Sequence, residues 1–516
     1  MRNGRLPIGC ACCSMSRRGF LAAGCAAACA GAASVMAAPR IARAAESGAK
    51  PRIKILYSLH EEVQSGPDWP NKGFDFRPVM ERTTAALTQG CPELAFTTAM
   101  ANGPEQAAAI VAENDADGYV VFQMNCWNQV VQTAVQTGKP VLYVDFQYGG
   151  SGGFLVYTAG FLRSEAPNLG FVASSDPEDM IAAAKCLAPA VRDGGFAEAV
   201  ARTRRARTPG PFDRVTKADA LQTLSPEECA GRFGDLKIVA VRDTESGDHP
   251  PVMGIPVTLI PFAELNAAWE GADKEEARAI ADRWEQSARV IEDVSRETLE
   301  TSAAMYLAEK QVLAAHGATA ITINCLGGFY GGHIHAYPCL GFHELNNEGL
   351  VGACECDISS TGTMLAFSTL AQGRPGYISD PVIDTAKRQI IYAHCVASNR
   401  VFGPEGPTNP FEILTHSEDR QGASVRSIMP EGYMTTSLQV SDPRKEILFH
   451  QGVSVENDPD DRACRTKLAA EPVGDIEKLF TQWDQWGWHR VTFYGDLKEP
   501  VFALADALGW KVVEEA

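Results

Sequence analysis

The sequence predicts an α/β protein in which two Rossmann-like α/β domains are followed by a β-rich, barrel-like C-terminal domain. The chain has 516 residues, of which 45% are hydrophobic, and this length predicts about three globular domains. From residue 53 onward, short apolar runs alternate with helical patterns, which is typical of βαβ units on a parallel sheet. After about residue 390, helical periodicity gives way to short β-rich segments with Gly and Pro, which indicates an antiparallel sheet.

The first 44 residues resemble an export signal. They contain six arginines and no Asp or Glu. The pair Arg17-Arg18 precedes Phe20-Leu21, an Ala/Gly/Cys-rich run follows, and Ala42-Arg43-Ala44 closes the segment. This order is similar to that of a twin-arginine signal peptide, which is removed after export. We therefore expect a periplasmic or secreted protein without a stable membrane anchor.

The charge of the chain excludes two classes of partner. The whole sequence has a net charge of −18, and removal of the first 44 residues leaves 40 basic against 64 acidic residues, a net charge of −24. A chain this acidic has no general attraction for nucleic acid or for anionic membranes. Small molecules and metal ions remain as candidate ligands.

The first α/β domain is expected at residues 45–155. Its predicted strands and helices alternate: strands at 53–58, 94–98, 118–122 and 140–145, and helices at 77–88 and 104–113. A glycine cluster at residues 149–153 matches neither the dinucleotide-binding nor the P-loop pattern, so we expect an ordinary loop there.

The second α/β domain is expected at residues 156–388 and the β-rich domain at 389–516. The second domain's predicted elements are helices at 176–191, 274–287 and 296–316, and strands at 237–241, 257–261 and 318–324. The predicted elements of the third domain are strands at 411–415, 433–440 and 446–449, a helix at 476–483 and an α/β segment at 491–513.

Histidines concentrate in the C-terminal half of the sequence. Seven of the ten lie between residues 333 and 489, in the company of carboxylates. They are His333, His335, His343, His394, His416, His450 and His489. A single histidine is usually a packed or surface residue, but a cluster with carboxylates suits Mn²⁺, Mg²⁺, Fe²⁺ or Zn²⁺.

Two separated motifs resemble the L-fucose isomerase and L-arabinose isomerase families. The segment Gly352-Ala353-Cys354-Glu355-Cys356-Asp357 precedes Gly362-Thr363-Met364-Leu365, and Ser379-Asp380 continues the match. Near the C-terminus, the segment from Trp486 to Gly495 is similar to the family's W-G-x-x-H-x-x-x-T-Y-G pattern, allowing for a one-residue gap. The family's three-domain architecture agrees with the layout predicted above.

The resemblance implies a divalent metal, most often Mn²⁺, held by two carboxylates and one histidine. Carried over to this sequence, Asp357 becomes the second carboxylate and His489 the histidine. Asp357 also stands where a helix N-cap is expected, before Ile358-Ser359-Ser360, so both roles remain open for it.

The first carboxylate has no obvious counterpart. The family places a glutamate about two dozen residues before the aspartate, but residues 330–339 contain no acid. Either His333 or His335 replaces this ligand, or Glu344 or Glu355 provides it.

The reaction that the resemblance implies is the interconversion of an aldose and a ketose. A base takes the proton from C2 and returns it at C1 through an enediol, while a metal stabilises the developing charge. Asp357, Glu355 and Glu344 are the candidate catalytic carboxylates. Candidate substrate contacts are His394, His416, Glu418 and Arg465.

We therefore expect a metal-dependent sugar isomerase. Two alternatives remain: an enzyme of the same fold that hydrolyses, epimerises or eliminates on a glycan, and a periplasmic sugar-binding protein. The resemblance also implies a homo-oligomer, often a hexamer, in which a neighbour's N-terminal domain completes the site.

Overall fold

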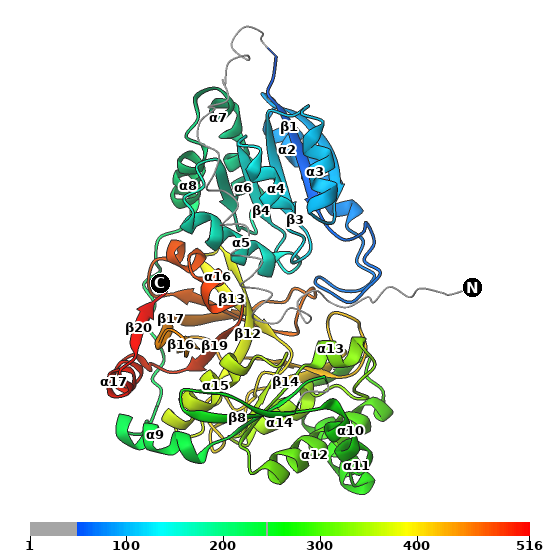
Figure 1. Ribbon diagram of the computed structural model, residues 1–516, viewed down its shortest axis with the longest axis vertical. Coiled ribbons are helices and arrows are strands. Elements are labelled where there is room, and N and C mark those ends of the chain that lie inside the picture. Colours follow the sequence, from blue (N-terminus) through cyan, green and yellow to red (C-terminus); the bar gives the residue numbers. More distant parts are fainter. Residues whose placement is uncertain (1–48, 244–245) are drawn as a thin grey trace, which may run out of the picture.

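The protein consists of two α/β parts with a β-barrel between them (Figure 1). The structure is a computed structural model that describes residues 49–243 and 246–516. The export signal expected at residues 1–44 therefore lies outside the described residues. Parallel sheets in the first two parts and an antiparallel barrel in the third confirm the mixed α/β class with a C-terminal barrel.

The first sheet has five parallel strands in the order β2-β1-β3-β4-β5. The strands are β1 (Arg52–Ser58), β2 (Ala95–Ala101), β3 (Gly118–Gln123), β4 (Val141–Asp145) and β5 (Leu169–Val172). Apolar side chains on alternate positions feed two cores, one on each face of the sheet. The helices α3 (Pro104–Ala112), α4 (Val130–Gln136) and α5 (Ser151–Arg163) cover one face. The opposite face is covered by α2 (Arg77–Gly90), α6 (Pro177–Lys185) and α8 (Phe196–Arg207), with the short α7 (Leu187–Asp193) between the last two.

Two features of this part differ from the expected layout. The sheet extends beyond residue 155, because β5 pairs with β4. The glycine cluster is not a loop, since α5 already begins at Ser151. The glycines serve close packing: a Cβ at Gly152 would stand 2.6 Å from the ring of Trp488, and one at Gly153 would stand 2.8 Å from the backbone nitrogen of Trp127.

The second sheet has the order β11-β10-β6-β8-β7, with four parallel strands and an antiparallel edge strand. Its strands are β6 (Ile238–Val241), β7 (Gly247–Val252), β8 (Ile255–Ile260), β10 (Ala320–Ile323) and β11 (Val351–Ala353). The surrounding helices are α9 (Pro226–Arg232), α10 (Phe262–Glu270), α11 (Lys274–Ser287), α12 (Arg296–His316), α13 (Cys325–Tyr330), α14 (Cys339–Asn347) and α15 (Ile358–Leu370). Loops at the carboxyl ends of its parallel strands face the barrel, which is the usual location of ligand sites in α/β folds.

The barrel is closed by six antiparallel strands in the order β16-β19-β12-β13-β18-β17, with β17 pairing back to β16. They are β12 (Tyr377–Asp384), β13 (Gln389–His394), β16 (Met434–Ser441), β17 (Glu446–Asn457), β18 (Thr466–Pro472) and β19 (Arg490–Tyr494), and β20 (Lys511–Glu514) adds to β17 in parallel. The barrel thus begins before the expected boundary at residue 389.

Smaller elements complete the third part. The predicted strand at 411–415 is β14 (Phe411–Leu414), which pairs with β9 (Val290–Glu292) and β15 (Ser424–Ser427) outside the barrel. The predicted helix at 476–483 divides into η2 (Ile476–Phe480) and α16 (Trp483–Trp486), and α17 (Lys498–Leu508) precedes β20. Across residues 49–243 and 246–516, no helix has the length and apolar character needed to cross a bilayer.

Candidate metal centre

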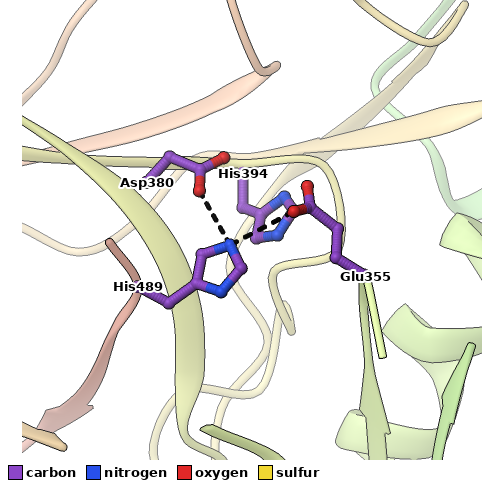
Figure 2. A group of neighbouring side chains, drawn as sticks. All are labelled: Glu355, Asp380, His394 and His489. Atoms are coloured by element: carbon purple, nitrogen blue, oxygen red, sulfur yellow. Dashed lines mark ion pairs between the residues drawn. The ribbon is translucent and has the colours of Figure 1, made fainter. Parts of the chain in front are cut away.

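Four side chains converge where the second sheet meets the barrel: Glu355, Asp380, His394 and His489. One ligand atom from each lies within 4.8 Å of the others (Figure 2). Glu355 follows β11, Asp380 lies in β12, His394 ends β13, and His489 directly precedes β19. Four segments that are far apart in the sequence therefore bring two carboxylates and two imidazoles to one point.

The backbone after β11 turns sharply to deliver Glu355. Glu355 has a φ of 64° and Cys356 a φ of 52°, a left-handed conformation that is uncommon for residues with side chains. The amide of Cys356 donates to the carbonyl of Ile323 at 3.0 Å, which ties the turn to the neighbouring strand β10. Such strained positions persist where the surrounding structure holds them, and they concentrate at functional sites.

Three of the four side chains have a buried polar atom without a well-aligned hydrogen bond, although two of these atoms face each other as an ion pair, Oδ1 of Asp380 and Nε2 of His489. These atoms are Oδ1 of Asp380, Nε2 of His394 and Nε2 of His489. Leaving buried polar atoms unpaired is costly, and most proteins avoid it. The donor set of two carboxylates and two imidazoles is one that Mn²⁺, Fe²⁺ or Zn²⁺ accepts, so these residues fit a divalent metal.

The electrostatics of His489 also call for a cation at this point. Its Nε2 lies 2.9 Å from Oδ1 of Asp380 and 3.5 Å from Oε2 of Glu355 (Figure 2). Burial lowers the pKa of His489, but Asp380, together with Asp357 and Glu355, outweighs this effect and raises the pKa well above its ordinary value. Either a proton or a metal ion is needed to balance these carboxylates.

Asp357 lies behind His489 and outside the group of four. Its Oδ2 is 2.9 Å from Nδ1 of His489, the ring nitrogen that faces away from the group. Asp357 is also the N-cap of α15, because its Oδ1 accepts from the amide of Ser360 at 3.0 Å. Of the two roles considered from the sequence, Asp357 has that of the helix cap, and instead of joining the metal ligands it orients His489 through Nδ1.

The structure does not bring Glu344, His333 and His335 to the group. Glu344 accepts from the indole nitrogen of Trp284 at 2.7 Å and pairs with Arg283. His333 and His335 are exposed, and their rings lie against aromatic side chains of α10. Glu355 instead precedes Asp380 by 25 residues, which is the separation that the resemblance implies between the two carboxylates. Glu355 and Asp380 therefore take the places of the family's glutamate and aspartate, whereas the sequence comparison had placed Asp357 in the aspartate position.

Sequence reasoning missed two members of the group as ligands: His394, which was a candidate substrate contact, and Asp380. Its segment, Ser379-Asp380, was part of the matched pattern, but Asp357 occupied the aspartate role. The spacing of about two dozen residues from Glu355 was the signal that could have identified it.

His416 and Glu418 occupy a buried loop after β14. The hydroxyl of Tyr330 donates to Glu418 at 2.8 Å, and burial raises the pKa of Glu418 to about 8. His416 lies 3.5 Å from Asp419. Burial lowers its pKa, but Asp419 and other nearby anionic groups outweigh this and raise the pKa to about 9. At neutral pH, Glu418 is therefore protonated and His416 is charged.

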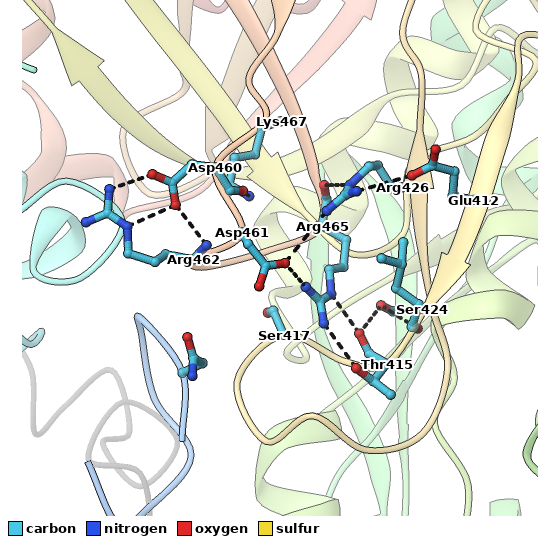
Figure 3. Close-up of polar contacts among 12 residues, drawn as sticks. Glu412, Thr415, Ser417, Ser424, Arg426, Asp460, Asp461, Arg462, Arg465 and Lys467 are labelled. Carbon is cyan, nitrogen blue, oxygen red and sulfur yellow. Dashed lines mark hydrogen bonds and ion pairs between the residues drawn. The ribbon is translucent and has the colours of Figure 1, made fainter. Parts of the chain in front are cut away.

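Arg465 directs three of its five N–H donors to protein acceptors. It donates to the carbonyl and the hydroxyl of Thr415 at 2.8 and 3.1 Å, and it pairs with Asp461 at 2.7 Å (Figure 3). These bonds anchor the loop that carries His416.

A loop of the N-terminal domain closes over this region within the same chain. The amide of Lys72 donates to the carbonyl of Glu418 at 2.6 Å, and the amide of Ala463 donates to the carbonyl of Pro70 at 3.0 Å. The ring of Trp488, next to His489, packs against Trp69 of this loop, with 5.3 Å between ring centroids. The chain thus supplies an aromatic wall beside the metal centre from its own first domain.

Comparison with known proteins gives relatives of one kind. No protein-family model matches the chain. A sulfoquinovose isomerase of Clostridium sp. (strain MSTE9) is 24% identical over 303 residues, which are 55% of this chain and 66% of the relative. A sulfoquinovose isomerase of Priestia aryabhattai is 24% identical over 319 residues, 58% of this chain and 68% of the relative. The chain thus spans about two thirds of the length of these relatives. A solute-binding protein of Agrobacterium vitis, solved with α-D-tagatopyranose, aligns at 12% identity over 53% of this chain and 76% of its own, with a TM-score of 0.16 that supports no shared fold.

Proposed function

We propose that the protein is a metal-dependent aldose–ketose isomerase acting on a free sugar. One observation carries this proposal: Glu355, Asp380, His394 and His489 converge on one point, and three of them have a ligand atom there without a hydrogen bond. The similarity to sulfoquinovose isomerases over more than half of the chain supports the same reaction class. Sulfoquinovose is therefore the first substrate to test, and Mn²⁺ the first metal.

The four residues would hold the metal ion, and two of them have a further role. A divalent cation, when bound, would polarise the sugar oxygens at C1 and C2 and stabilise the negative charge that develops on them. Glu355 and Asp380 approach the centre from different elements, so their carboxylates can lie on either side of a bound sugar. One carboxylate takes the proton from C2, this proton exchanges with solvent, and a proton is then delivered from the carboxylate to C1.

The remaining groups position and enclose these carboxylates. Asp357 holds His489 through Nδ1, which leaves Nε2 free for the metal. Glu418, protonated at neutral pH, offers a proton donor for the sugar ring oxygen, and the charged His416 offers a second donor beside it. Trp69 and Trp488 exclude water from one side.

The proposal extends to the context of the enzyme. The sequence of residues 1–44 supports export by the twin-arginine route, and the acquisition of a metal before export suits a pathway that carries folded proteins. A homo-oligomer remains part of the proposal on the resemblance alone, since the wall of this site comes from the same chain.

The test combines metal analysis with isotope exchange. The purified chain from residue 45 is incubated in D₂O with sulfoquinovose and a panel of neutral aldoses, and the products are followed by NMR. We expect ketose formation with deuterium at C1, loss of activity in EDTA and recovery with Mn²⁺. Absence of a bound divalent ion together with absence of exchange for every aldose would overturn the proposal. Ketose formation without deuterium would retain the isomerase and show that hydrogen passes from C2 to C1 without exchange with solvent, which contradicts the exchange step proposed here.

A further inference from the structure

A buried lysine faces the same side of the barrel wall as the metal-centre carboxylate Asp380. In the strand register, Asp380 of β12 is opposite Ala393 of β13, and Ala393 is opposite Lys467 of β18. Residues directly opposite one another in antiparallel strands point to the same face, and adjacent strands are about 4.8 Å apart. Lys467 therefore lies two strands, or about 10 Å, from Asp380 on the same face of the barrel wall, with Ala393 on the strand between them.

The ammonium group of Lys467 has no carboxylate partner among the described residues. The residue is 2% exposed, and its Nζ donates to the backbone carbonyl of Asp460 at 2.7 Å (Figure 3). No ion pair involves Lys467 across residues 49–243 and 246–516, so two of its three N–H donors have no protein acceptor. An ammonium group buried without a counter-charge is costly, and burial lowers the pKa of Lys467 to about 8.

The nearby carboxylates are already engaged with other cations. Asp460 accepts from Nε and Nη2 of Arg462 at 2.9 and 2.6 Å (Figure 3). Asp458 lies 3.9 Å from Lys387 and accepts from the amide of Asp460. The positive charge of Lys467 is therefore available to a ligand.

The wall opposite the ammonium group belongs to the N-terminal domain. The ring of Tyr148 lies 5.5 Å from Nζ of Lys467. The ammonium group of Lys467 thus lies between the barrel wall and the N-terminal domain, on the face of the wall that also carries Asp380.

We infer that Lys467 binds an anionic substituent, a sulfonate or a carboxylate, at the end of the sugar remote from C1 and C2. This inference rests on the proposed function for the placement of C1 and C2 at the metal centre. A sugar chain that begins there extends across Ala393 toward Lys467, and an anion at its far carbon supplies the missing counter-charge and accepts the free N–H donors. In a mature chain with a net charge of −24, a local cation is needed to hold such a substrate.

The test compares matched sugars with and without the anion. The probes are sulfoquinovose, its neutral counterpart 6-deoxy-D-glucose, and D-glucuronate, which carries a carboxylate in place of the sulfonate. The variants are Lys467→Met, which removes the charge at similar length, and Lys467→Arg, which retains it. Lys498→Met is the matched control, because it removes one exposed lysine remote from this strand.

In Lys467→Met, we expect KM for the anionic sugars to rise about 10- to 100-fold with little change in kcat, as for a lost charged hydrogen bond. Activity on 6-deoxy-D-glucose should be unchanged, and Lys467→Arg should restore part of the preference. Preference for sulfoquinovose over D-glucuronate, or the reverse, identifies which anion the site accepts. An equal loss for charged and neutral sugars would show that Lys467 only supports the fold, and the inference would fail.

Calorimetric binding separates this inference from the proposed reaction. If the wild-type protein binds sulfoquinovose without converting it, and Lys467→Met does not bind it, the inference stands and the isomerase proposal fails. If the enzyme isomerises neutral sugars and Lys467→Met leaves sulfoquinovose binding unchanged, the isomerase proposal stands and the inference fails.

Discussion

Two clusters of histidine and acid lie buried in the barrel domain, and they differ in whether each polar atom has a partner. In the first, the metal centre, Oδ1 of Asp380 and Nε2 of His489 form an ion pair at 2.9 Å but neither atom has a hydrogen bond, and Nε2 of His394 has none either. In the second, His450 binds the hydroxyl of Tyr392 through Nε2 at 2.6 Å and Glu515 through Nδ1 at 2.9 Å. Arg490 completes this second cluster with two bonds to Glu515, at 3.0 and 2.6 Å.

The comparison teaches that a density of histidines does not identify a site. His450 is as buried as His489, and its surroundings are as rich in charge, but every polar atom around it is satisfied. His343 is similar, since Nδ1 lies 2.6 Å from the carbonyl of Ala397 and Nε2 lies 3.1 Å from Asn347. A ligand site requires lone pairs that remain unused and that point to one place.

The largest effect is expected when a histidine of the metal centre is replaced, in contrast to replacement of an exposed histidine. His489→Ala removes one ligand and the partner of Asp380, so we expect loss of the bound metal and a fall in kcat/KM of about 10³-fold or more. Metal content is measured by mass spectrometry on the purified protein, and activity by ketose formation. His333→Ala is the control, because this exposed histidine packs on Phe262 and should change neither. Retention of both metal and activity in His489→Ala would remove His489 from the centre.

The second prediction concerns the hydrogen-bonded cluster of His450, Arg490 and Glu515, where a substitution should change the stability of the protein but not its metal affinity. Glu515→Gln leaves Arg490 and His450 without their buried counter-charge, and we expect a loss of about 3–5 kcal/mol in the free energy of unfolding. Metal-free proteins are compared by urea unfolding, and the metal affinity of the folded variant should match that of the wild type. Glu514→Gln is the control, because Glu514 is exposed and its one ion pair among the described residues is with Lys498, which should contribute about 0–1 kcal/mol. A change in metal affinity in Glu515→Gln would mean that the two clusters are coupled.

The pH dependence of this cluster has a definite sign. Burial raises the pKa of Glu515, but Arg490 and His450 outweigh it and lower the pKa to about 2. The unfolded glutamate titrates near pH 4.3, so the stabilisation is present above that pH and is lost as the pH falls toward 2. Wild-type stability should decline between these values, and Glu515→Gln should show a smaller decline.

Much of the fold could be predicted from the sequence, because it depends on local apolar periodicity. The helix expected at residues 296–316 is α12, and the strand expected at 237–241 is β6. The placement of β14 beside β9 could not be predicted, because pairing of strands that are more than 100 residues apart depends on tertiary packing.

The site was only partly predictable for a different reason. Glu355, His394 and His489 were candidates, but the choice between Glu355 and Asp357 depends on the left-handed turn at Glu355 and Cys356. In an extended chain these two acids would point to opposite faces. The turn instead places them at the two nitrogens of one imidazole, Glu355 at Nε2 and Asp357 at Nδ1.

A smaller effect is expected from the residue behind His489. Asp357→Asn keeps a good helix N-cap but removes the charge that holds the imidazole, so we expect metal affinity to weaken about 10- to 100-fold. Competition with a chelator measures the affinity, and thermal unfolding of the metal-free protein verifies that α15 is intact. Asp380→Asn should weaken binding further because it changes a direct ligand. Equal affinities in Asp357→Asn and the wild type would make Asp357 a helix cap only.

The smallest effect concerns an unpaired acid that is not a site. Glu309 of α12 is fully buried, and neither carboxylate oxygen has a hydrogen-bond partner. It lies against Gly341 of α14, where a Cβ would stand 2.0 Å from Oε2 of Glu309. Burial raises the pKa of Glu309 well above its ordinary value, so the side chain is neutral in the folded protein.

Glu309 extends the comparison between the two clusters, because its carboxylate has no hydrogen bond but no other potential metal ligands are grouped with it. Below about pH 4 the glutamate is neutral in both the folded and unfolded states, so Glu309→Gln should match the wild type in stability. Above that pH the unfolded glutamate ionises and the folded one does not, so the wild type loses stability relative to the variant. At neutral pH we expect Glu309→Gln to be the more stable protein, measured by urea unfolding across the pH range, with the exposed Glu297→Gln as control. A destabilised Glu309→Gln at neutral pH would show that this carboxylate has a partner, and an unpaired buried acid would then indicate a ligand even without convergent neighbours.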